Sequence, residues 1–357
     1  MGPYDRLDWR LPYLTETLPG VGGRIRVHPE DFVVEEIPAY DACGEGEHTF
    51  FRVEKREITT PALIRQVARA LDISPRDVGS AGRKDKYAVA RQTLSVWKVP
   101  PERILELDLE QAQVLWAKRH TNKLQVGHLR GNRFLLRIRD VHPRAEVRAA
   151  AIFEVLTQRG VPNGYGRQRF GNRGDNDKIG LALLREDRAA LEWRGIHGLS
   201  RGQRRFYVNA LQSALFNHYL RARMCDEKMD SLLPGDVAKK HATGGLFIVE
   251  DVERERPRVA RWEISATGPI YGYKMMAARA EAAALEAQIL GEIELTAEVF
   301  RRVKAKGSRR ALRYRPADLD WRVEDDALVV AFVAPKGAYA TLLLRELMKC
   351  EAAEDAD

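Results

Sequence analysis

Apolar residues in the first part of the chain recur with the period of an α-helix in two places. Thr60 and Pro61 begin a segment in which an apolar side chain returns every three or four positions, which predicts a helix over residues 60–72. Its apolar face comprises Leu63, Ile64, Val67, Ala68 and Leu71. A second helix is expected between His142 and Gly160, because a proline favours a helix start and a glycine favours its end.

Other segments alternate between apolar and polar residues, as strands do. Such alternation predicts strands over residues 93–99 and 133–139, the second with Phe134, Leu136 and Ile138 on one side. Residues 245–249 and 327–333 are short apolar runs that also indicate strands. A Pro-Lys-Gly turn follows the last run and leads into a helix whose apolar face comprises Tyr339, Leu342, Leu343 and Leu347.

The middle of the chain has a different character. Residues 161–177 contain four glycines and three arginines without an apolar period, which predicts a long loop, and loops of that length are usually functional or disordered. Helical patterns follow near residues 206–223 and 275–291. The basic run 301–310 is interpreted as a solvated surface hinge, with a specific RNA contact as the alternative. The acidic tail 351–357 is expected to fray.

The last 50 residues return to the mixed strand and helix pattern of the first 155. This return suggests that a middle domain is inserted between two parts of one domain. A chain of 357 residues is long enough for two domains with cores of their own.

Composition and charge narrow the possible partners. The 59 Lys and Arg residues exceed the 51 Asp and Glu residues, a formal charge of +8 that favours polyanion partners such as nucleic acid. Simple solubility is the alternative explanation of such a charge. The three cysteines are widely spaced, and the histidines lack metal-ligand spacing. Neither a long apolar run nor a signal peptide is evident. We therefore expect a cytoplasmic protein without a membrane segment or a metal.

The common catalytic motifs are missing from the sequence. It contains no phosphate-binding loop of the P-loop type, no nucleophile elbow and no kinase motifs, and its Gly-rich segment has the wrong spacing for a dinucleotide. A cofactor-free enzyme or a binding module remains.

One charged stretch suggests chemistry. In AGRKDKYAVARQ, residues 81–92, Asp85 lies between Lys84 and Lys86. Neighbouring cations stabilise the ionised carboxylate of a nucleophile, and the same cations can hold phosphates. A surface turn with alternating charges gives the same pattern, so composition alone leaves both interpretations open.

Six motifs in order resemble the TruD family of tRNA pseudouridine synthases. They are HPEDFVVEEIP with GEGEHTFFRVEKREITT, AGRKDKYAVARQ, GHLRGNRFLLRIRD, VPNGYGRQRFG, ALQSALFNHYL and KGAYATLLLREL. The resemblance implies an α+β fold: a mixed, largely antiparallel sheet built from both chain ends, with an inserted α/β domain. The implied boundaries are 1–157 with 309–357 for the catalytic domain and 158–308 for the insert.

The resemblance also implies an activity, the isomerisation of a tRNA uridine to pseudouridine without a cofactor. Asp85 aligns with the essential aspartate, and Arg345 with the basic residue expected to pair with it. The residues expected to contact the substrate are Phe32, Lys84, Asn132, Phe134 and Tyr339. Two positions depart from the family pattern: Tyr339 stands where phenylalanine is usual, and Gly164 follows Asn163 where an aromatic is common and is expected to loosen the loop.

The target of the family in bacteria is uridine 13 in the D arm of tRNA, which is the expected target here. Two alternatives remain, namely a sister synthase that acts on other RNA uridines and a non-catalytic RNA-binding module. A monomer is expected.

Overall fold

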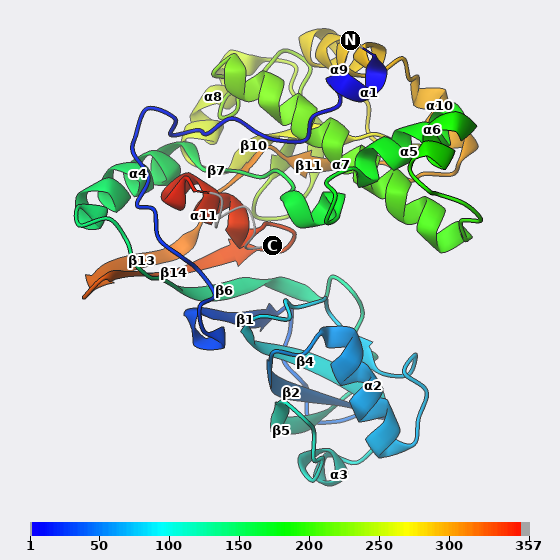
Figure 1. Ribbon diagram of the computed structural model, residues 1–357, viewed down its shortest axis with the longest axis vertical. Coiled ribbons are helices and arrows are strands. Elements are labelled where there is room, and N and C mark those ends of the chain that lie inside the picture. Colours follow the sequence, from blue (N-terminus) through cyan, green and yellow to red (C-terminus); the bar gives the residue numbers. More distant parts are fainter. Residues whose placement is uncertain (1, 351–357) are drawn as a thin grey trace.

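A computed structural model describes residues 2–350; the acidic tail, 351–357, lies outside the described residues. Its largest element is an eight-stranded sheet in the order β13-β14-β6-β1-β4-β2-β5, with β3 paired to β4 (Figure 1). The strands are β1 (Phe32–Pro38), β2 (His48–Arg56), β3 (Gly79–Ser80), β4 (Val89–Trp97), β5 (Ala112–His120), β6 (Leu129–Ile138), β13 (Ala317–Glu324) and β14 (Ala327–Pro335). Only β1 and β4 run parallel among the described pairs, so the sheet is mixed and largely antiparallel, as the resemblance implied.

Both ends of the chain build this sheet, because β14, from the C-terminal part, pairs with β6. The register places Phe332 opposite Phe134 and Ala334 opposite Asn132. Gly131 permits this close approach, since a Cβ at that position would lie 2.3 Å from the Ala334 carbonyl oxygen. The pairing therefore brings the C-terminal motif directly beside the GNRF motif.

Helices cover the sheet in two groups. The helices α4 (Ala145–Arg159) and α11 (Ala340–Met348) pack together over the β6–β14 region, while α2 (Thr60–Leu71) and α3 (Pro101–Leu105) lie beside β2, β4 and β5 (Figure 1). The second group has a hydrophobic core of its own, which includes Leu63, Val67, Leu94 and Ile104. Two short turns of helix, α1 (Pro3–Arg6) and η1 (Pro29–Asp31), precede β1.

Residues between β7 and β12 form a second layer with its own sheet. Its order is β11-β10-β8-β9, all antiparallel, and β7 pairs with β12 where the chain enters and leaves. The elements are β7 (Val161–Pro162), η2 (Arg167–Phe170), α5 (Asn176–Arg185), α6 (Arg188–Trp193), α7 (Arg201–Cys225), β8 (Val237–Lys240), β9 (Leu246–Ile248), α8 (Val252–Ala260), β10 (Ile264–Ile270), α9 (Ala280–Glu292), α10 (Ala297–Arg302), β11 (Ser308–Ala311) and β12 (Arg313–Tyr314).

The predicted elements are present, with shifted ends. The predicted helix 60–72 is α2, with Thr59 as its N-cap and the predicted apolar positions Leu63, Val67, Ala68 and Leu71 buried. The helix predicted near 206–223 begins earlier, at Arg201, because Ser200 and Gln203 form a capping box. The predicted hinge 301–310 comprises the end of α10, a connecting segment over residues 303–307 and most of strand β11. Among the described helices, none is long and apolar enough to cross a membrane.

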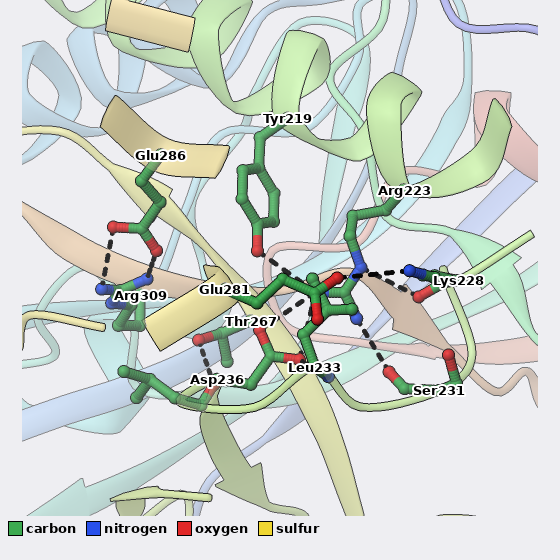
Figure 2. A network of polar contacts seen from close by, with 11 residues as sticks. Tyr219, Arg223, Lys228, Ser231, Leu233, Asp236, Thr267, Glu281, Glu286 and Arg309 are labelled. Carbon is green, nitrogen blue, oxygen red and sulfur yellow. Dashed lines mark hydrogen bonds and ion pairs between the residues drawn. The ribbon is translucent and has the colours of Figure 1, made fainter. Parts of the chain in front are cut away.

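A buried ion pair holds the second layer together (Figure 2). Nη1 of Arg223, on α7, lies 3.0 Å from both carboxylate oxygens of Asp236, and each side chain is 1% exposed. The other guanidinium nitrogens donate to the carbonyls of Lys228 and Ser231, and Tyr219 supplies its hydroxyl as a further acceptor. These bonds fix the loop that leads from α7 into β8.

We predict that Asp236→Ala destabilises the protein by about 3–5 kcal/mol, because it leaves the Arg223 charge buried without its counter-ion. Urea denaturation measures this change. The matched control is Glu253→Ala, which breaks an exposed pair with Arg256 and should cost about 0–1 kcal/mol. Equal effects of the two variants would contradict the structural role of the buried pair.

Candidate active site

Asp85 lies in the loop between β3 and β4, and two buried side chains hold the backbone around it. The Lys84 amide donates to Oγ1 of Thr60 at 2.9 Å, and Nζ of Lys55 donates to the Asp85 carbonyl at 2.5 Å. Burial lowers the pKa of Lys55 to about 8, although the negative charge of Asp85 opposes the shift. The Asp85 side chain itself is 34% exposed, so its carboxylate is accessible.

Arg26 is a cation that lies beside the Asp85 carboxylate. Its Nη2 lies 3.4 Å from Oδ2 of Asp85, and its guanidinium carbon lies 4.2 Å from the centre of the Phe32 ring. Arg26 precedes β1, and Asp85 precedes β4. Because β1 and β4 pair in parallel, the two residues lie at the same end of this strand pair. Sequence analysis missed Arg26, which precedes the HPEDF motif by two residues; a cation directly upstream of a motif aromatic is the pattern that could have indicated it.

Arg345 lies on the predicted C-terminal helix and bonds to the N-terminal segment of the chain. It lies on α11, where Nη2 and Nη1 donate to the carbonyls of Leu11 and Pro12 at 2.5 and 3.2 Å, and the guanidinium lies 3.9 Å from the centre of the Tyr13 ring. The N-terminal segment crosses α11 at this point. These described contacts of Arg345 go to the N-terminal segment, and its pairing with Asp85 stays a prediction.

Lys84 lines the same site and is bonded to other protein groups there. Its side chain is 5% exposed, and Nζ lies 2.8 Å from Oε2 of the buried Glu36 and 2.9 Å from Oδ1 of Asn132. The ammonium is thus already neutralised by a carboxylate inside the protein. Because Lys84 engages the amide oxygen of Asn132, this side chain presents its N–H donors to a ligand.

Six of the seven predicted site residues line one pocket of about 180 Å³. This volume lies below the roughly 300–1,000 Å³ of sites for drug-sized ligands and suits a single planar base. We call it the base pocket; its lining comprises Phe32, Val34, Arg83, Lys84, Asp85, Asn132, Phe134, Gln168, Ala338, Tyr339, Ala340 and Thr341. The structure brings together residues from β1, the β3–β4 loop, β6, η2 and α11.

The aromatic residues contribute unequally to the base pocket. Phe32 and Phe134 are 1% and 6% exposed. Their rings meet edge to face with 6.0 Å between the ring centres, and the Phe134 ring stacks on that of Phe332 with 5.2 Å between the centres. Both rings therefore also serve the core, and their edges form a rigid wall. Tyr339 is only half-buried, and its ring centre lies 5.8 Å from that of Tyr165. Its ring is therefore more accessible than those of Phe32 and Phe134.

The loop after β7 closes one side of the base pocket through Gln168. Its neighbours fix it in place, because Arg169 donates to Oγ of Ser213 at 2.9 Å and Phe170 stacks on Trp9 at 4.7 Å. Gly164 does not loosen this loop as expected. A Cβ there would lie 2.4 Å from Cδ1 of Leu11, so the glycine permits close packing of the N-terminal segment.

A second, larger pocket of about 620 Å³ shares Ala338 with the base pocket. We call it the basic pocket, because its described lining contains no acidic residue and includes Arg130, Lys239, Arg309, Arg310, Arg313, Arg315 and Lys336. Burial, reinforced by the charges of Lys336 and Arg310, lowers the pKa of Lys239. Among these cations, Arg309 is paired with Glu286 (Figure 2), and its Nη1 lies 2.5 Å from Oε1 of that residue.

Comparison with known proteins shows the family to which this chain is similar. The family described as tRNA pseudouridine synthase D (TruD) matches residues 10–193 and 188–347. The tRNA pseudouridine synthase D of Geobacter metallireducens is 40% identical over an alignment of 395 residues, covering 94% of this chain and 97% of that protein. The tRNA pseudouridine synthase D of Thermus thermophilus is 45% identical over an alignment of 347 residues, which covers 96% of this chain and 93% of that protein.

A solved structure shares the fold. The crystal structure of the putative tRNA pseudouridine synthase D (TruD) from Methanosarcina mazei matches with a TM-score of 0.77 and 23% identity, covering 97% of this chain and 98% of that one. The match in fold accompanies sequence matches that run through every segment of the base pocket. The chain therefore belongs to the tRNA pseudouridine synthase D family.

Proposed function

We propose that this protein isomerises uridine 13 of tRNA to pseudouridine, with Asp85 as the nucleophile. The observation that carries the proposal is the position of Asp85: an accessible carboxylate, held beside Arg26, on the wall of a pocket sized for one base. Family membership supports the reaction and the tRNA substrate. We further propose that the protein acts in the cytoplasm as a monomer and requires no metal or organic cofactor.

The reaction explains why a carboxylate is needed. The N1–C1′ bond of uridine breaks and a C5–C1′ bond forms, while the C5 proton leaves to solvent and N1 gains a proton. A carboxylate can attack C1′ or C6, or remove the 2′ proton, and each of these routes requires its ionised form. The positive charge of Arg26 stabilises that ionised form in the proposed site.

The base pocket suits a flipped uridine. Extrusion of a base costs roughly a few kcal/mol, and stacking on an aromatic side chain returns about 1–3 kcal/mol. We propose that Tyr339 stacks on the uracil, that the edges of Phe32 and Phe134 limit its depth, and that the amide of Asn132 donates to a uracil carbonyl. Lys84 contributes by orienting Asn132, to which it is bonded.

We propose an indirect contribution from Arg345. Its bonds to Leu11 and Pro12 tie the N-terminal segment to α11, the helix that begins directly after Tyr339. It therefore supports the pocket wall from outside.

The two layers have separate proposed roles. We propose that the two chain ends form the catalytic domain and the middle of the chain the insert, with boundaries expected near 157/158 and 308/309. The β7–β12 pair, a few residues inside the first boundary and beyond the second, marks their junction. The basic pocket combines residues of both, among them Lys239 of β8 and Lys336 after β14. Arg310 and Lys336 donate to neutral carbonyl and amide oxygens, so their charges are available to RNA phosphates.

We predict that Asp85→Asn lowers pseudouridine formation by about 10³-fold or more while tRNA still binds, because the amide cannot serve as nucleophile or base. Product is mapped in transcripts carrying uridine or cytidine at position 13. Product at another uridine favours the sister-synthase alternative. Binding by the wild type without product at any uridine favours the binding module, and an active Asp85→Asn variant contradicts the role of Asp85.

A second prediction concerns the basic pocket. The double variant Lys239→Gln with Lys336→Gln should weaken tRNA binding and reduce the slope of log K against log salt by about 2, since each phosphate contact contributes about 1. The rate at saturating tRNA should stay unchanged. The matched control is Arg103→Gln with Lys118→Gln, two exposed cations on α3 and β5 at the opposite end of the large sheet (Figure 1). Identical slopes for the two double variants would refute a phosphate site.

A further inference from the structure

The backbone on both sides of the Asp85 α-carbon is held by one neighbouring segment. On the N-terminal side, the amide of the preceding residue, Lys84, donates to Thr60. On the C-terminal side, the Asp85 carbonyl accepts from Lys55, whose ammonium also donates to the carbonyl of Ile58 at 2.7 Å. Thr60 in turn donates to Oε1 of Gln92 at 3.0 Å, which anchors it to β4.

A fully buried lysine such as Lys55 is unusual at a position whose role is only structural. Its side chain is fully buried, and burying an ammonium without a specific use is unfavourable. On the sheet it lies between Ala90 of β4 and Ala112 of β5, whose small side chains leave room for a long one. An apolar residue would fill that space at lower cost, but it would leave the Asp85 and Ile58 carbonyls without this donor.

We propose that Lys55 and Thr60 are positioning residues that set the Asp85 carboxylate for reaction. This inference rests on the proposed role of Asp85. The loop from Gly82 to Tyr87 contains no helix or strand, and a Cβ added at Gly82 would meet no other atom within 4 Å, so the loop depends on bonds from outside. A misplacement of about 1 Å can reduce a rate by about 10²-fold.

The charge on Lys55 gives the arrangement a pH dependence. The charged groups that face Lys55 are Asp85 and Lys84, and Lys84 is itself paired with Glu36. Because burial lowers the pKa of Lys55 to about 8, its ammonium is present below that pH and is lost as the pH rises through it. A neutral amine still donates but holds a carbonyl less strongly. The rate at saturating tRNA should therefore fall on the alkaline side.

The test compares kcat and KM for tRNA in four variants of the full chain. Lys55→Met should lower kcat by about 10²-fold with KM unchanged, and the alkaline fall near pH 8 should disappear. Thr60→Val should lower kcat by about tenfold, the worth of one hydrogen bond, and Thr60→Ser should restore it because it keeps the hydroxyl. The control Lys118→Met changes an exposed lysine on β5 and should match the wild type.

Two outcomes would overturn the inference: kcat of Lys55→Met within twofold of the wild type, or an alkaline fall that persists in that variant. If Lys55→Met does not fold, the comparison of Thr60→Val with Thr60→Ser decides, and equal rates for those two contradict the inference. A wild type that forms no pseudouridine refutes the proposed function instead, so the two failures are distinguishable.

Discussion

The position of the Asp85 backbone is the constraint on which the site depends. A carboxylate on a loop without helix or strand is useful only if the loop is fixed, and here Lys55 and Thr60 bond to the backbone on either side of it. Both residues are buried, so the hydrophobic packing of β2 and α2 determines where the loop lies. The large sheet supplies the other side of the site. Because β1 runs parallel to β4, Phe32 lies at the same end of this strand pair as Asp85.

The second requirement is that distant segments meet at the base pocket. The pairing of β14 with β6 places α11, and with it Tyr339, beside Asn132. The N-terminal segment reinforces this arrangement, since Arg345 holds the Leu11 carbonyl and Glu346 accepts from the amides of Leu14 and Thr15. The insert contributes Gln168 and the neighbouring basic pocket. Substrate contacts from both layers thus depend on contacts made far from the reacting atoms.

Sequence predicted the local structure and the residues that gather at the base pocket, but not their pairing. The apolar period of residues 60–72 is a local property and needed no tertiary information. The Arg26–Asp85 contact depends on the β1–β4 register, so the sequence did not indicate it. Nor did the sequence indicate the hydrogen bonds of Arg345, because they depend on the path of the N-terminal segment. The burial of a side chain is equally non-local, so the sequence did not indicate that Lys84 pairs with Glu36 inside the protein.

The most direct test of the account is a crystal structure of the Asp85→Asn protein bound to its tRNA. We expect the target uracil to lie in the base pocket, against Tyr339 and within hydrogen-bond distance of Asn132, with residue 85 facing the ribose and its carbonyl still bonded to Lys55. A bound tRNA whose bases all remain stacked outside an empty base pocket would contradict the account.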